Sequence, residues 1–210
     1  MVTAPGEGSL ADVPWLVVGL GNPGADYSGN RHNVGYRVVE RLADQLGGRF
    51  SGHRSRAEVL EGRLPPSGGR PGPRLILAKP TTFMNESGGP VAGLVRYYRT
   101  TLERLLVVHD DLDLPLGTVR LKRGGGEGGH NGLRSVSRSL GGKDYCRLRL
   151  GIGRPPGRMD PADFVLRDFS GAERSERDLM IEEATEGIVR VAHEGFERAQ
   201  ASVNNTQSPG

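Results

Sequence analysis

Two stretches of the chain combine residue types that can move a proton to or from water. Residues 15–35 join a short apolar run and a glycine-rich turn to His32, which stands among asparagines. Residues 105–115 join a second apolar run to an acidic cluster that includes Asp110. A neutral imidazole accepts a proton from water, and a carboxylate on its other nitrogen fixes the tautomer and stabilises the imidazolium. With no serine or cysteine placed nearby as a nucleophile, this pairing predicts ester hydrolysis without a covalent intermediate.

The apolar runs explain how these residues come together. Residues 15–18 and 105–108 have the composition of strands buried on both faces. Because ligands in α/β folds collect beyond the carboxyl ends of the strands, both polar stretches are expected at one edge of a sheet.

The remaining elements interleave along the chain. Further strands are predicted at 56–64, 75–78, 118–122 and 146–152, and helices at 34–46, 91–98, from 133 onward, and at 172–201, with a short helical turn at 160–169. Since strands and helices alternate without an internal repeat, the fold class is predicted to be α/β. We expect a single-domain three-layer α/β/α sandwich around a twisted, mostly parallel (mixed) sheet.

Composition sets the limits of the domain. Residues 1–13 are predicted to form a flexible extension, 14–201 the folded domain and 202–210 a disordered tail, while the Pro- and Gly-rich loop at 65–73 is expected to be mobile. The N-terminus does not resemble a signal peptide, and no apolar run is long enough to span a membrane. The single cysteine, Cys146, excludes an internal disulfide and is expected in the core. These features favour a soluble cytoplasmic protein without membrane partners.

The positive charge of the chain comes almost entirely from arginine. The formal net charge is +3 and the pI about 9.3, and lysine occurs only at 79, 122 and 143, so 25 of the 28 basic residues are arginine. The planar fork of arginine suits phosphate. Composition alone also fits arginines spread over a solvated surface. The positions of the arginines must therefore decide between such a surface and a phosphate-binding site.

The sequence matches the known patterns of dinucleotide, P-loop and metal sites poorly. The turn at 19–24 formally matches the GxGxxG fingerprint of dinucleotide-binding enzymes, but the helical pattern starts only at Val34 and no acid follows the next strand for a ribose. The run 141–143 continues with Asp144, where a P-loop needs serine or threonine. The cluster at 109–113 has one or two side chains that can point the same way, so no metal site is predicted.

Five blocks of the sequence, in this order and spacing, closely resemble bacterial peptidyl-tRNA hydrolase: VVGLGNPGADYSGNRHNVG, KPTTFMNESG, HDDLDLPLG, GGGEGGHNGLRS and RLRLGIGRP. The likeness extends over roughly residues 15–201. It implies an enzyme that cleaves the ester between a peptide and the terminal ribose of tRNA, recycling tRNA from prematurely dissociated peptidyl-tRNA. The family needs no cofactor and is usually monomeric and cytoplasmic.

The resemblance implies a role for each residue at a matching position. His32 would be the general base, Asp110 the residue that orients it, and Asn22 the sensor of the acylated amino group. Asn85 and Asn131 would hold the peptide backbone and the attacking water or the oxyanion.

Other matching positions would bind the CCA end and acceptor stem of the tRNA. Lys122 and Arg149 would clamp the 5′ phosphate, and such contacts make binding fall with salt. The remaining matching residues would shape the cleft for the peptide and the terminal adenosine: Tyr27, Phe83, Met84 and, close by, His130. From the residues alone, Phe83 and Met84 could equally belong to the core.

The departures from the family pattern are small. Asp111 stands where glutamate is more frequent, and Glu127 brings an acid into the glycine loop that would face RNA. The main alternative from another class is a non-catalytic RNA-binding relative of the same fold. The intact His32 and Asp110 argue against it, since a pure binding module has no need of a base with its orienting acid.

Overall fold

The computed structural model describes residues 13–67, 69 and 71–206, so the expected N-terminal extension lies almost entirely outside the described residues. In this part of the chain, seven strands form one sheet in the order β2-β3-β4-β1-β5-β7-β6. The strands are β1 (Trp15–Gly19), β2 (Ser51–His53), β3 (Ala57–Arg63), β4 (Arg74–Pro80), β5 (Leu105–Asp111), β6 (Val119–Arg123) and β7 (Cys146–Gly151).

The centre of the sheet is parallel and its two edges are antiparallel. Strands β4, β1, β5 and β7 run parallel, whereas β2 and β3 at one edge and β6 at the other pair antiparallel. The prediction of a mostly parallel, mixed sheet is therefore confirmed. Strand β2 was not predicted, because its three residues, Ser51, Gly52 and His53, carry no apolar pattern.

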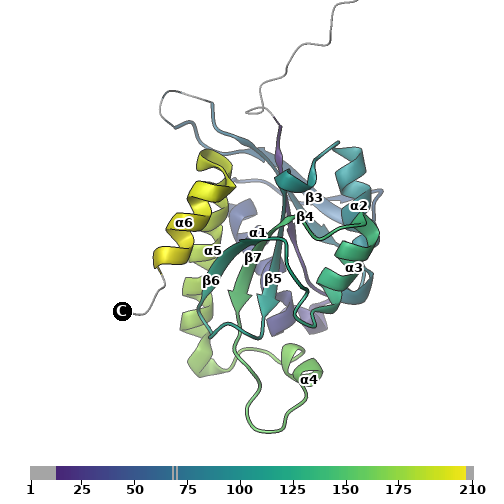
Figure 1. The fold of residues 1–210 in the computed structure, drawn as a ribbon, viewed down its shortest axis with the longest axis vertical. Helices are drawn as coiled ribbons and strands as arrows, with labels where there is room; N and C mark the ends of the chain where they lie inside the picture. Colours follow the sequence, from purple (N-terminus) through teal and green to yellow (C-terminus); the bar gives the residue numbers. More distant parts are fainter. Residues whose placement is uncertain (1–12, 68, 70, 207–210) are drawn as a thin grey trace, which may run out of the picture.

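Helices cover both faces of the sheet (Figure 1). One face packs against α1 (Val34–Gln45), α5 (Arg174–Glu194) and α6 (Phe196–Thr206), and the other against α2 (Gly88–Tyr97) and α3 (Asn131–Leu140). Alternate residues of β1 feed the two cores, Val17 into one and Val18 into the other. The short α4 (Pro161–Val165) lies beyond the carboxyl ends of β5 and β7, and Asp160 caps it by accepting from Ala162 N at 2.8 Å.

The C-terminal region differs from the prediction in two ways. The single helix expected over 172–201 is broken at Gly195, whose φ of 87° only glycine adopts readily, and α6 starts at the next residue. Residues 202–206, expected in a disordered tail, continue α6, while 207–210 lie outside the described residues. The polar composition of 202–206 predicts disorder, but a tertiary contact orders this segment. The side-chain amide of Asn204 bonds to both backbone groups of Leu121, at 2.9 and 3.0 Å.

Candidate active site

The position of His32 follows from close packing of glycines at the end of β1. His32 lies in a 3-10 turn, η3 (Arg31–Asn33), directly before α1. A Cβ on Gly35 would come within 2.4 Å of the carbonyl oxygen of Val108, and one on Gly19 within 2.3 Å of the oxygen of Gly35. Only glycines let the start of α1 press against β1 and β5. This contact brings His32 beside the end of β5, which carries Asp110.

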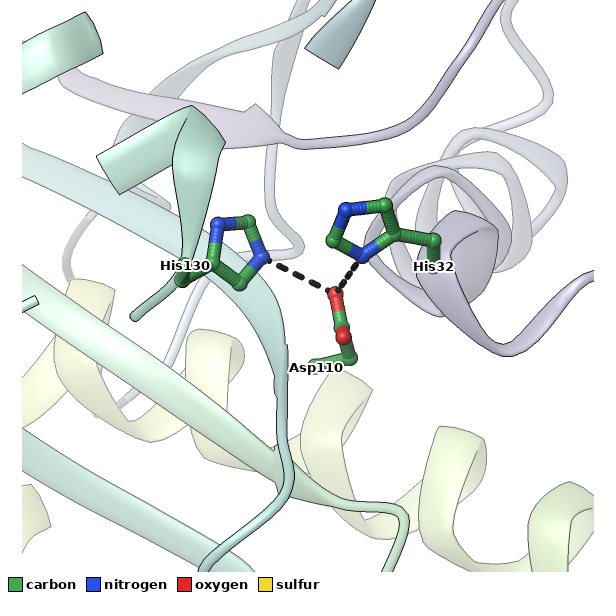
Figure 2. A group of neighbouring side chains, drawn as sticks. All are labelled: His32, Asp110 and His130. Atoms are coloured by element: carbon green, nitrogen blue, oxygen red, sulfur yellow. Dashed lines mark hydrogen bonds and ion pairs between the residues drawn. The ribbon is translucent and has the colours of Figure 1, made fainter. Parts of the chain in front are cut away.

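Two histidines bind one carboxylate oxygen (Figure 2). The Nδ1 atom of His32 lies 2.8 Å from Oδ1 of Asp110, and Nε2 of His130 lies 3.0 Å from the same oxygen. His130 caps the start of α3, where its Nδ1 accepts from the backbone N–H of Leu133 at 3.3 Å. This assigns the proton of His130 to Nε2. In His32 the proton is assigned to Nδ1, because this nitrogen must donate to the carboxylate of Asp110. The Nε2 atom of His32 therefore keeps a free lone pair.

The electrostatics of the site favour an ionised Asp110 beside His32. Burial alone would raise the pKa of the Asp110 carboxyl, but the charges and hydrogen bonds of His32 and His130 outweigh it and hold that pKa well below its usual range. Burial would lower the pKa of His32, yet the Asp110 carboxylate outweighs burial and raises it. The imidazole can therefore accept a proton and hold it beside a carboxylate.

A third histidine completes the surroundings of Asp110. His109 is buried, and its Nδ1 lies 2.7 Å from the backbone oxygen of Asp110. Burial and the neighbouring His130 lower the pKa of His109 to about 3, so it stays neutral. Sequence reasoning gave His109 no role, and no local pattern reveals this contact.

A cleft with a volume of about 480 Å³ opens onto these groups. Six of the predicted site residues line it: His32, Asp110, Lys122, His130, Asn131 and Arg149. Arg149 donates through Nε to Asp111 at 2.7 Å, whereas Lys122 is exposed. Glu127, the acid that departs from the family pattern in the glycine loop, pairs with Lys143 at 3.1 Å.

A buried arginine that the sequence analysis missed fixes the glycine loop. Arg147 donates to the carbonyl oxygens of Gly126 at 2.6 Å and Gly125 at 2.9 Å, and its guanidinium lies 4.7 Å from the ring centroid of Tyr145. The alternating pattern of β7 predicts a basic face but does not distinguish the buried Arg147 from the half-buried Arg149. The loop conformation therefore depends on a side chain that the pattern treats as a surface charge.

Asn22 is held by a network beside the cleft. Its Oδ1 accepts from the N–H of Met84 at 2.8 Å, while its own N–H donates to Oδ1 of Asn33 and its carbonyl accepts from Nδ2 of Asn33. Because Oδ1 faces a donor, the Nδ2 group of Asn22 is oriented away from Met84. Asn33 was not assigned a role from the sequence, although it directly follows His32.

Besides Asn22, four more of the predicted residues do not line the cleft. Met84 is buried in the core under α2 and α3, while Asn85, the next residue of the same 3-10 turn (η4, Met84–Glu86), is exposed. Phe83 is 53% exposed and meets Tyr27 edge to face, with 6.1 Å between ring centroids. Of the two roles left open for Met84, the structure shows the core packing.

The cluster in Figure 2 also resembles a metal-ligating set. His32, Asp110 and His130 each offer one ligand atom, and these atoms lie within 4.8 Å of one another. The three groups already satisfy one another by hydrogen bonds, so neither imidazole needs an ion to fix its orientation.

Comparison with known proteins identifies the family of this fold and site. The family model for peptidyl-tRNA hydrolase matches residues 16–209. The chain belongs to the peptidyl-tRNA hydrolase family. It is 58% identical over 187 residues to the peptidyl-tRNA hydrolase of Kineococcus radiotolerans, covering 89% of this chain and 94% of the relative. The match to the enzyme of Frankia casuarinae is 56% over 200 residues, covering 95% and 96%.

Solved structures of the family share the fold. The crystal structure of peptidyl-tRNA hydrolase from Acinetobacter baumannii superposes with a TM-score of 0.84 at 35% identity, covering 94% of this chain and 97% of that one. The family is one of carboxylic ester hydrolases that act on peptidyl-tRNA. Across the described residues, none of the helices is both long enough and apolar enough to cross a bilayer.

Proposed function

We propose that this member of the peptidyl-tRNA hydrolase family cleaves the ester between a peptide and the 3′-terminal ribose of tRNA, using His32 as general base. The observation that carries the proposal is the pair formed by His32 and Asp110: Nδ1 is bound to the carboxylate, which leaves Nε2 as the basic nitrogen of a side chain that lines the cleft.

The reaction follows from the proton positions. The Nε2 lone pair of His32 takes one proton from water as the water oxygen attacks the ester carbonyl carbon. Asp110 stabilises the imidazolium across the 2.8 Å contact. When the tetrahedral intermediate collapses, the C–O bond to the ribose breaks and the imidazolium returns its proton to the leaving 3′ oxygen. The products are a peptide carboxylic acid and free tRNA, and His32 is neutral again.

Asparagine amides support the charge and the choice of substrate. Asn131 lines the cleft and would donate to the developing oxyanion, with Asn85 holding the peptide backbone nearby. Asn22 would offer its Nδ2 donor to the carbonyl that acylates the substrate's amino group, because its Oδ1 is occupied by Met84. A free aminoacyl ester presents an ammonium group there, which has donors only and is repelled.

Binding of the tRNA would begin at the basic wall of the cleft. Arg149 is held by Asp111 through Nε, which leaves the outer edge of its guanidinium for the 5′ phosphate beside Lys122. Tyr27 and Phe83 would contact the peptide or the terminal adenosine from the neighbouring loop. A monomeric, cytoplasmic enzyme is part of this proposal, since peptidyl-tRNA arises at ribosomes.

The test compares release of tRNA from an N-blocked aminoacyl-tRNA and from the same unblocked ester, in chelator, with the wild type and the His32→Ala protein. Rapid cleavage of the blocked ester alone, abolished by the substitution while tRNA binding persists, is the expected result. Tight tRNA binding without cleavage by the wild type would instead establish the RNA-binding relative.

A further inference from the structure

A further cavity lies at the opposite edge of the sheet from Lys122 and Arg149. Its volume is about 500 Å³, and it is lined by the β2–β3 loop and α2, through Arg54, Ser55, Arg56, Gly89, Gly93, Arg96 and Tyr97. Four strand spacings, about 19 Å, separate β3 from β7 in the strand order. This cavity is therefore separate from the cleft that contains His32.

The cavity carries uncompensated positive charge. Arg54, Arg56 and Arg96 are all exposed, no carboxylate lines the cavity, and none of the three forms an ion pair within the part of the chain that the structure describes. Other arginines in the protein do have acidic partners, such as Arg149 with Asp111 at 2.7 Å. Three guanidinium forks around one hollow match the geometry of phosphate groups.

The backbone of Arg56 adds an independent indication. Residues 54–56 form a three-residue hairpin loop, since His53 pairs with Ala57 across β2 and β3. The last residue of such loops adopts a left-handed conformation and is usually glycine. Here it is Arg56, with φ of 54°, and its carbonyl accepts from the N–H of Thr81 at 2.9 Å. The chain thus carries a guanidinium where the backbone favours glycine, and such outliers gather at functional positions.

An aromatic surface lies beside the three guanidinium groups. Tyr97 is 49% exposed, and its ring is held by His53 and Tyr98, with centroids at 4.5 and 4.8 Å. The guanidinium of Arg54 lies 4.9 Å from the centroid of Tyr97. Exposed aromatic rings next to arginine planes provide stacking surfaces for nucleic-acid bases.

We propose that this cavity binds a single-stranded RNA segment. Arg54, Arg56 and Arg96 contact its phosphates, and a base stacks on the exposed part of Tyr97. RNA is favoured over an acidic peptide because a base uses the aromatic ring and the phosphates use the forks, whereas a carboxylate chain uses only the charge. This site goes beyond the proposed hydrolysis and does not depend on it.

The experiment measures fluorescence anisotropy of a labelled eight-nucleotide single-stranded RNA. All proteins carry Lys122→Ala and Arg149→Ala, which removes the basic wall of the cleft. We expect Arg54→Ala, Arg56→Gly and Arg96→Ala each to weaken binding about tenfold. Each should also lower the slope of log affinity against log salt by roughly 0.7, the value for one lost phosphate contact on a single strand. Arg74→Ala, a charge-matched change at the start of β4, should leave binding unchanged.

Arg56→Gly separates binding from folding. Glycine relieves the positive φ of this position, so the melting temperature should be equal or higher while RNA binding falls. Unchanged RNA affinity in all three variants would overturn the proposal. So would equal affinity for an acidic peptide of the same length and charge. Cleavage of N-blocked aminoacyl-tRNA, measured on the single Arg56→Gly protein, should keep the wild-type kcat.

Discussion

The Nη2 atom of Arg31 lies 2.9 and 2.8 Å from the two carboxylate oxygens of Glu173. The same guanidinium donates through Nη1 to the backbone oxygens of Arg167 and Asp168, and it lies 4.3 Å from the ring centroid of Phe164. Since Arg31 directly precedes His32 in η3, this partly buried contact joins the turn that carries the imidazole to the segment between α4 and α5.

The first prediction concerns this contact. Arg31→Lys keeps the charge but loses most of the hydrogen bonds, so it should lower kcat with little change in KM by letting His32 move. It should also reduce the free energy of unfolding by about 2–4 kcal/mol, because one ammonium cannot replace the hydrogen bonds of the guanidinium to Glu173, Arg167 and Asp168 in a partly buried site. Urea denaturation and steady-state kinetics measure the two effects. Arg41→Lys, in the exposed pair with Glu182, is the control and should cost under about 1 kcal/mol.

The second prediction concerns the pH profile. The reaction needs neutral His32, whose pKa is raised by the Asp110 carboxylate despite burial, so kcat/KM should fall as pH drops through this raised value. Asp110→Asn removes the charge and should move the acid limb to lower pH while reducing kcat roughly 10²- to 10⁴-fold. An unshifted acid limb in this variant would show that a different group sets the profile.

The third prediction concerns stability against pH. The pKa of Asp110 is lowered in the folded protein, so its contribution is present above about pH 4 and is lost as pH falls. The pKa of His32 is raised, so its contribution is full below about pH 6.5 and is lost as pH rises through the folded-state value. The difference in free energy of unfolding between wild type and Asp110→Asn should therefore peak between these limits. Urea titrations at pH 3, 5.5 and 9 give the three values.

The fourth prediction concerns the choice between blocked and free aminoacyl esters. Asn22→Asp keeps an oxygen for the N–H of Met84 but replaces the Nδ2 donor with a second acceptor. The variant should attract an ammonium group, so its preference for the N-blocked ester over the free ester should fall by roughly 10- to 100-fold, equivalent to about 1–3 kcal/mol. Competition between the two esters measures the ratio. A preserved ratio would remove Asn22 from the selection step.

Local composition was enough to predict the centre of this fold. Strands β1 and β5 are buried on both faces, so each stands out as an apolar run, and the polar residues that follow them meet at one sheet edge. This placed His32 beside the acidic cluster at 109–113, and the family resemblance singled out Asp110 within it. The short β2 was missed because its residues form no apolar run. The break at Gly195 was missed because the apolar spacing continues on both sides of it.

The partners of Asp110 and Arg31 could not be predicted in the same way. The bond from His130 to Asp110 depends on the angle at which α3 leaves the glycine loop, and the ion pair of Arg31 spans 142 positions in sequence. Such contacts are set by how whole elements pack. The spacing of residues along the chain does not predict these contacts.

The break at Gly195 has a consequence for association between molecules. By turning the chain, it lays α6 against β6, whose outer edge would otherwise expose backbone groups to strands of other molecules. Gln200 and Asn204 both donate to the carbonyl oxygen of Leu121, and Asn204 accepts from the N–H of the same residue. Side-chain amides thus occupy the backbone N–H and carbonyl of Leu121, two groups that an incoming strand would need, and coverage of this kind opposes edge-to-edge association.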